Sequence, residues 1–247
     1  RSIAPSVKMG TPIAAAPTPQ PITKLAYQST DSEMRVAALL QDQHLWLTTS
    51  RSVSRPDGTT AASTTQVDLT SNIPGRITAL TLASRAELLA AGTADGKVYH
   101  FDFRDAAKPV LVETSQASDP DQAITALAYL MGDRSLVTGD AAGQVVVWMP
   151  VREHAGTNQT HMTNVHRFLP HQSAVTEITI SQRDKGFITT DAEGEIRLHH
   201  STSAQTLLTI SPKQGVLRST YFSPKADGLV SVSDNNHLLH YQIANPY

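Results

Sequence analysis

The chain has no cysteine among its 247 residues. Disulfide frameworks, thiolate metal sites and cysteine nucleophiles are therefore excluded. Charge is also scarce, since 17% of the residues are charged and the formal net charge is -2. Because the few lysines and arginines are scattered, no basic patch for nucleic acid or an anionic membrane surface is present. We expect no nucleic-acid partner.

Long apolar runs and known catalytic motifs are missing as well. The longest uncharged apolar stretches, such as Val145 to Val151, are far shorter than the roughly 20 residues that cross a bilayer. The sequence contains no Gly-x-Ser-x-Gly elbow, Walker loop, dinucleotide fingerprint or His-Glu-x-x-His motif. We therefore expect no enzymatic activity, no catalytic residues and no cofactor.

What the sequence does contain is a repeated spacing. An apolar residue that opens an Ile-Thr-x-Leu-like strand is followed nineteen residues later by the last residue of a tight turn. The pairs are Ile77 and Gly96, Ile124 and Gly143, Val175 and Gly194, and Leu217 and Asn236. Fixed spacing within a unit, with variable linkers between units, indicates one supersecondary unit copied several times.

Each unit is expected to hold four strands. Two apolar strands, a tight turn and a third strand are followed by a more variable fourth segment. A first, degenerate copy spans residues 22–47 and turns at Asp42 and Gln43. The fourth segments are Thr65 to Leu69, Val110 to Glu113, Val165 to Leu169 and Thr206 to Ile210, and the fifth unit shows none. The pattern predicts an all-β propeller of about five four-stranded blades, either a compact ring or part of a larger one.

The propeller is expected to occupy residues 22–247, with a proline-rich tail or closing strand at 1–21. Apolar residues around Ile3 to Val7 are candidates for the missing fourth strand of the last blade. The stretch from Ser50 to Thr65 is interpreted as an exposed loop inserted in the first blade. Residues 50–66, 104–122 and 150–174 are the best candidates for contact with other proteins.

Two sets of polar residues are candidate ligands. Thr93, Asp140, Asp191 and Ser233 begin successive turns, where they form either a polar ring for a cation or caps for the turn's own N–H groups. We prefer the second interpretation, because every hairpin needs such a group. The histidines have neither zinc-finger nor helical metal spacing, so no metal site is predicted. They are His154, His161, His166 and His171 in one connection, and His199 with His200 at a strand end.

The units resemble the WD-repeat family, whose blades carry a Gly-His pair before the first strand, an Asp in the turn and Trp-Asp after the third strand. His171 stands four residues before Val175, Asp95 matches the turn Asp, and Trp148 matches the Trp. Phe101-Asp102 occupies the Trp-Asp site with Phe in place of Trp. No blade holds the whole set, so we describe the units as WD-like.

The last blade and its exit, from Asp234 to Tyr247, resemble the soluble propeller domain of bacterial phosphate ABC transporter permeases (PstC-like). That resemblance implies a noncatalytic periplasmic accessory domain, tethered to the inner membrane through the rest of its parent chain. Its partners would be the transmembrane body of the transporter and a periplasmic binding protein. Two alternatives remain open: a propeller that binds or hydrolyses a small ligand in its central channel, and a free-standing cytoplasmic WD-like scaffold.

Overall fold

The computed structural model describes residues 19–30, 32–54, 58, 60–152, 160–211 and 215–243. Strands dominate these ranges, and no helix among them is long and apolar enough to span a membrane. The elements are β1 (Ile22–Ser29), β2 (Glu33–Leu40), β3 (Leu45–Ser54), β4 (Thr60–Asp68), η1 (Thr70–Asn72), β5 (Ile77–Leu82), β6 (Leu88–Thr93), β7 (Lys97–Asp102), β8 (Val110–Gln116), β9 (Ile124–Tyr129), β10 (Leu136–Asp140), β11 (Val145–Arg152), β12 (Thr160–Arg167), β13 (Val175–Ile180), β14 (Gly186–Asp191), β15 (Ile196–His200), β16 (Gln205–Ile210), β17 (Leu217–Phe222), β18 (Gly228–Ser233) and β19 (Leu238–Gln242).

The strands form five antiparallel sheets that follow one another along the chain. We call them blade 1 (β1–β4), blade 2 (β5–β8), blade 3 (β9–β12), blade 4 (β13–β16) and blade 5 (β17–β19). Within each blade, strands that are consecutive in sequence pair with each other. This architecture confirms the predicted all-β propeller with five blades.

The nineteen-residue spacing ends at a turn that needs a left-handed backbone. Gly143 has φ of 86°, and Asn236 occupies the same place in blade 5 with φ of 64°. A Cβ on Gly143 would lie 2.5 Å from the carbonyl oxygen of His171, in the chain that enters the next blade. The left-handed conformation favours glycine or asparagine, and the close approach of the following blade restricts this position to glycine.

Successive blades pack through four apolar clusters. Each cluster takes residues from two neighbouring blades, and together they join blade 1 to 2, 2 to 3, 3 to 4 and 4 to 5. In the third cluster, for example, Val147 of blade 3 packs with Phe187 of blade 4, and both are fully buried. A four-stranded sheet cannot bury both of its apolar faces alone, so each blade depends on its neighbours.

Polar clamps tie blades together at the loops between their first and second strands. Asp133 of blade 3 accepts hydrogen bonds from the backbone N–H groups of Ser84, Arg85 and Ala86 in blade 2, at 2.9, 2.6 and 2.9 Å. Burial opposes ionisation of Asp133, but these donors hold its pKa below the usual range. Arg35 of blade 1 reaches the same loop, where it donates to the carbonyl oxygens of Arg85 and Ala86.

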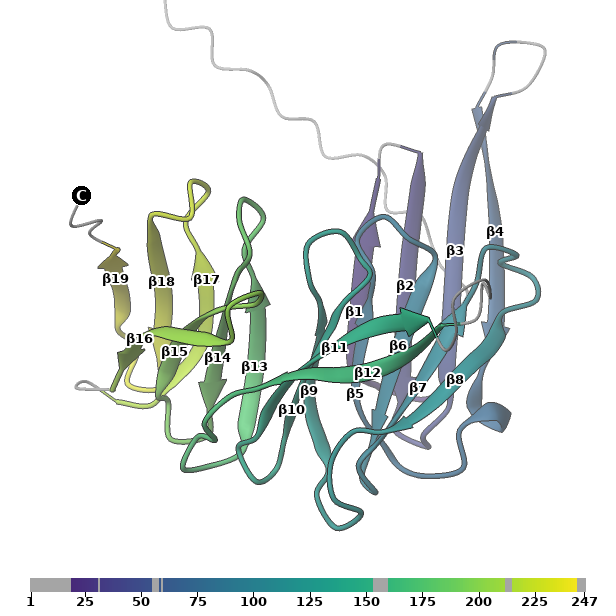
Figure 1. Cartoon of the computed structure of the whole chain (residues 1–247). Helices are drawn as coiled ribbons and strands as arrows, with labels where there is room; N and C mark the ends of the chain where they lie inside the picture. Colours follow the sequence, from purple (N-terminus) through teal and green to yellow (C-terminus); the bar gives the residue numbers. More distant parts are fainter. Residues whose placement is uncertain are drawn as a thin grey trace, which may run out of the picture.

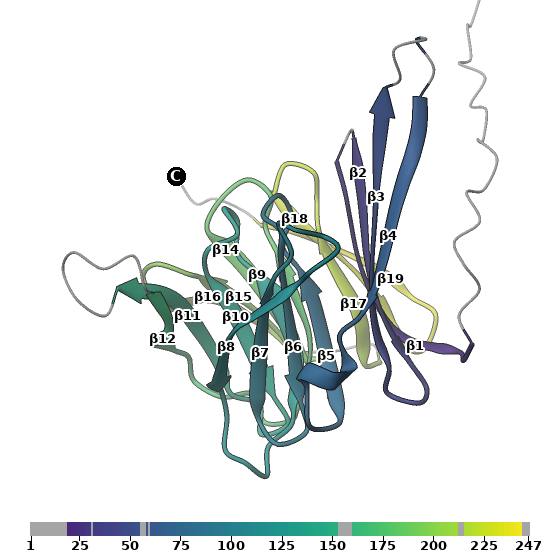
Figure 2. The same cartoon turned by 90° about the vertical axis from the view of Figure 1, so that its right-hand side faces the viewer.

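Among the described residues, the first and last blades are not packed against each other through an apolar cluster, although every other pair of consecutive blades shares one. Figure 1 shows the sheets as a row, with β1–β4 and β17–β19 at opposite ends. Figure 2, turned by 90°, shows blade 3 displaced to one side of both ends. The described blades therefore form an arc rather than a closed ring.

The prediction of an exposed loop from Ser50 to Thr65 is wrong for most of these residues. β3 and β4 extend through it as a long hairpin, in which Ser50 pairs with Thr64 and Ser54 with Thr60. Serine and threonine are common in loops, but here their side chains alternate along paired strands, and the Thr64 hydroxyl donates to Ser50 Oγ at 3.1 Å. The proposed contact regions 104–122 and 150–174 likewise contain the strands β8 and β12.

The predicted tail falls mostly outside the described residues, including the stretch from Ile3 to Val7. β1 begins at Ile22. Blade 5 has three strands among the described residues, so one edge of β19 has no strand paired to it there. The expectation of a missing fourth strand in this unit agrees with the observed sheet.

Candidate functional sites

A chain of buried polar side chains crosses blade 4. Nε2 of His171 lies 2.7 Å from the hydroxyl of Thr189, which lies 2.8 Å from Nε2 of His199. Nδ1 of His199 continues the chain to Thr206 at 3.0 Å. His199 also stacks on Phe187, with ring centroids 4.9 Å apart. The network links the loop that enters the blade to its second, third and fourth strands.

The other nitrogen of His171 faces two carboxylates. Its Nδ1 lies 3.5 Å from Oδ2 of Asp191 and 3.4 Å from Oε1 of Glu195. Burial lowers the pKa of His171, and the nearby Arg197 lowers it further, against the opposite effect of the two acids. Burial likewise lowers the pKa of His199, to about 3. Both rings are therefore neutral at physiological pH.

The network resembles the polar set of the WD-repeat family, with His199 in place of the tryptophan and with Asp191, the first residue of the turn, as its aspartate. In blade 3 the indole nitrogen of Trp148 donates to the hydroxyl of Thr138 at 3.0 Å. His199 occupies the place of Trp148 in blade 4, because each follows the first residue of its turn by eight positions. The aspartate beside the network is Asp191, which begins the turn, whereas Glu193 stands at the position that Asp95 holds in blade 2. The substitution of His for Trp hid this network from motif matching.

Asp95, which we matched to the turn aspartate, has a different role. It accepts a hydrogen bond from Thr93 Oγ1 at 2.6 Å and pairs with Lys97 at 2.9 Å. These contacts hold the pKa of Asp95 below its usual range. Phe101, matched to the family's Trp, is buried in the cluster between blades 1 and 2.

The residues that begin the turns bond to their own turns, as the preferred interpretation predicted. Asp140 accepts from the N–H of Ala142 at 3.0 Å and of Gln144 at 2.9 Å. Asp191 accepts from Glu193 and Glu195 at 3.1 and 2.8 Å. Ser233 also accepts from the His237 N–H, whereas the Thr93 hydroxyl donates to the Lys97 carbonyl and so stays within its turn without capping an N–H group. These four residues do not form a ring of free ligands.

The remaining histidines are dispersed. His161 and His166 lie on β12, whereas His154 is outside the described residues. His200 makes a 3.0 Å contact with Ser203 Oγ. Among the described residues, the one group of three or more potential ligand side chains that could hold a metal is His171, Asp191 and Glu195. Of the histidines that the sequence analysis considered, only His171 lies in such a group among the described residues.

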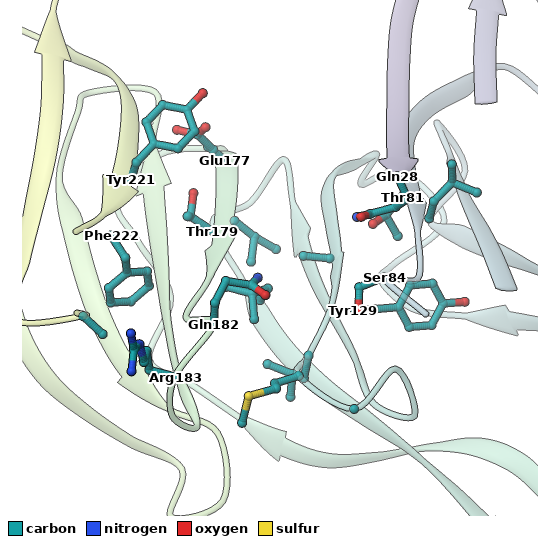
Figure 3. Close-up of a pocket in the computed structure, with 18 of the residues that line it drawn as sticks. Gln28, Thr81, Ser84, Tyr129, Glu177, Thr179, Gln182, Arg183, Tyr221 and Phe222 are labelled. Carbon is teal, nitrogen blue, oxygen red and sulfur yellow. The ribbon is translucent and has the colours of Figure 1, made fainter. Parts of the chain in front are cut away.

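The first strands of all five blades surround a central cavity of about 930 Å³. Figure 3 shows Tyr221 and Glu177 on one side of this space and Gln28 and Thr81 on the other. Burial raises the pKa of Glu177, against the effect of the Thr220 N–H that donates to its carboxylate at 3.0 Å. Arg183 donates to the carbonyl oxygen of Pro224 at 3.1 Å. Both charged groups therefore help to join blade 4 to blade 5.

The repeated four-stranded unit, its turns and the polar network of blade 4 together define a WD-like β-propeller. Within that class, the chain belongs to the family described as nucleolar protein 10-like, N-terminal domain, whose model matches residues 64–244.

Two solved structures share the fold. The computationally designed Ika4 protein is 22% identical, with a TM-score of 0.53, over 70% of this chain and 94% of that one. The β-propeller domain of Cps50 (Swd1) from Myceliophteria thermophila is 14% identical, with a TM-score of 0.65, over 85% of this chain and 66% of that one. No match was found among curated proteins.

These findings correct the expected function and location. A noncatalytic periplasmic domain of a phosphate ABC transporter permease is wrong, because the family model is that of a nucleolar protein's N-terminal domain. Nothing in the comparisons supports the permease resemblance. The segment that suggested it consists mainly of a turn and β19, where Asn235 Oδ1 accepts from the Ser233 hydroxyl and lies 2.8 Å from Nδ1 of His237. Such contacts serve the hairpin and carry no information about a transporter.

Proposed function

We propose that the chain is a noncatalytic WD-like scaffold of the nucleus or cytoplasm that binds other proteins. Two kinds of evidence support the proposal: the family match to a nucleolar protein's domain and the similarity to a propeller domain of Cps50. The proposal corresponds to the scaffold alternative of the sequence analysis. The expectation of no nucleic-acid partner stays a prediction.

The observation that carries the proposal is the exposed apolar surface at the two ends of the arc. Tyr221 on β17 and Leu238 on β19 are 59% and 72% exposed, and they lie on the face of blade 5 away from blade 4. Leu25 and Tyr27 on β1 are exposed at the opposite end. Large exposed apolar groups at unpaired sheet faces are typical of surfaces that bind other proteins.

The cavity supports scaffold function better than catalysis. Two charged side chains that line it, Glu177 and Arg183, form hydrogen bonds with backbone groups of blade 5. A catalytic pair would instead need an acid or base within reach of a nucleophile or substrate.

The proposal is tested by purifying the tagged chain with its partners from its own cells. A double variant, Tyr221→Glu with Leu238→Glu, is expected to lose at least one stoichiometric partner. The matched control is Val110→Glu with Val112→Glu, since both valines are 57% exposed on the outer strand β8. A fluorescent fusion is expected in the nucleus or cytoplasm. Identical partners for both variants, or an envelope location, would contradict the proposal.

A further inference from the structure

Three potential metal-ligand atoms converge beside the turn of blade 4. They belong to His171, Asp191 and Glu195, and all lie within 4.8 Å of one another. The side chains of His171 and Asp191 are 0% and 1% exposed, and that of Glu195 is 21% exposed. His171 and Asp191 are therefore buried, and solvent reaches the group only through the partly exposed Glu195.

The histidine is held with one nitrogen directed at the two acids. Its Nε2 is engaged by the Thr189 hydroxyl at 2.7 Å. Its Nδ1 is buried and makes no hydrogen bond that satisfies ordinary geometry. Buried nitrogens without partners are rare, and each needs a physical explanation. A hydrogen bond to the remote nitrogen is also the arrangement that orients a metal-binding histidine.

The two distances from His171 match those of a tetrahedral site, and the two carboxylate oxygens lie within 4.8 Å of each other. Zn²⁺ binds histidine nitrogen and carboxylate oxygen at about 2.0–2.2 Å, which places adjacent ligand atoms of a tetrahedron roughly 3.3–3.6 Å apart. Nδ1 of His171 lies 3.5 Å from the Asp191 oxygen and 3.4 Å from the Glu195 oxygen. These separations are too long for good hydrogen bonds but suit two ligands of one ion.

The charged side chains beside His171 carry one net negative charge, because Arg197 offsets one of the two carboxylates. Arg197 donates to Glu195 Oε1 at 2.6 Å and is fixed by the carbonyl oxygens of Leu169 and Pro170. One guanidinium balances one of the two carboxylates, so the buried Asp191 lacks a cationic partner of its own. A bound divalent ion would supply it.

The turn can form without the side chains of His171 and Glu195. Blade 3 makes the same turn with Asp140, but Gln144 stands in the place of Glu195, and Ser118 takes the place of His171, since each donates its N–H to the turn glycine of the preceding blade. Blade 3 therefore shows that the hairpin folds without the extra histidine and glutamate.

We propose that His171, Asp191 and Glu195 bind one Zn²⁺ ion, with water at the fourth position on the exposed side of Glu195. Three protein ligands and one open position are a common zinc arrangement. This inference differs from the sequence-based expectation of no metal site. It does not depend on the proposed scaffold function, and its failure would leave that proposal unchanged.

Titration of the metal-free chain with Zn²⁺ and Co²⁺ tests the site. We expect one ion per chain by calorimetry, a raised melting temperature with Zn²⁺, and the intense visible absorption of tetrahedral Co²⁺. Glu195→Gln is expected to weaken binding by more than about tenfold, because even outer-shell changes cost 10–100-fold. This variant should fold, since blade 3 carries Gln144 at that position.

Glu193→Gln is the matched control, because Glu193 belongs to the same turn but not to the ligand group. It is expected to bind as tightly as the unmodified chain. The proposal would be overturned if the unmodified chain bound no Zn²⁺ at micromolar concentration. Binding that persisted unchanged in Glu195→Gln would overturn it equally, because exposed histidines elsewhere would then be the ligands.

Discussion

The junctions between blades and the two ends of the arc present the same kind of sheet face. That face is buried at the junctions and exposed at the ends. At the junction of blades 3 and 4, Phe168 and Phe187 pack edge to face with ring centroids 5.5 Å apart. At the end of blade 5, Tyr221 and Leu238 project from the sheet without such a neighbour among the described residues. The difference indicates that the four closed junctions stabilise the fold, whereas the sheet faces at the two ends are exposed among the described residues.

The largest expected effect comes from emptying a closed junction. Phe187→Ala should lower the free energy of unfolding by about 3–5 kcal/mol, because it leaves a cavity in a fully buried cluster. Leu238→Ala should change it by less than about 0.5 kcal/mol, because that side chain lies at an open end. Urea unfolding of both variants measures the contrast, and equal losses would contradict it.

Substitution by alanine should lower stability more at a turn glycine that faces the next blade than at a glycine in open space. Gly143→Ala is expected to cost about 2–4 kcal/mol, because a left-handed residue is strained and the new methyl group meets the backbone of His171. Gly132 has φ of 96°, but an added Cβ there would meet nothing within 4 Å, so Gly132→Ala should cost only about 1–2 kcal/mol. Thermal unfolding of the two variants distinguishes crowding from backbone strain.

A third contrast removes a polar clamp. Asp133→Asn should cost about 1–3 kcal/mol, because each carboxylate oxygen accepts from at least one backbone N–H group of blade 2 and one of them is replaced by a donor. Asp105→Asn is the control, since Asp105 caps only its own exposed loop, where it accepts from the Ala107 N–H. If both substitutions had the same small effect on urea unfolding, the clamp would not stabilise the junction.

The junction of blades 3 and 4 should also be sensitive to acid. His199 is neutral when folded, with a pKa of about 3, whereas in the unfolded chain it has the ordinary histidine value of 6.5. Its contribution is therefore complete above pH 6.5 and falls below it by up to about 1.4 kcal/mol per pH unit. His199→Phe copies Phe101 of blade 2 and should flatten this part of the profile in metal-free buffer. An unchanged slope would contradict the assignment.

The sequence predicted the repeated turns well, because Gly96, Gly143 and Gly194 meet a local requirement for positive φ. It missed the blade 4 network, since His199 replaced the expected tryptophan and only the fold brings it to Thr189. The hairpin of β3 and β4 was missed because its composition resembles a loop. The opening of the ring depends on how blades pack against one another, and no local pattern contains that information.

Blades 1 and 5 are separated among the described residues, whereas the four intervening junctions are closed. Because the chain has no cysteine, two can be introduced and spin-labelled without interference. Tyr27→Cys with Tyr221→Cys places labels on β1 and β17, and Thr179→Cys with Tyr221→Cys places them on the neighbouring first strands β13 and β17. We predict a clearly longer distance for the first pair by electron paramagnetic resonance. Equal distances would mean that the ring is closed and would contradict the account.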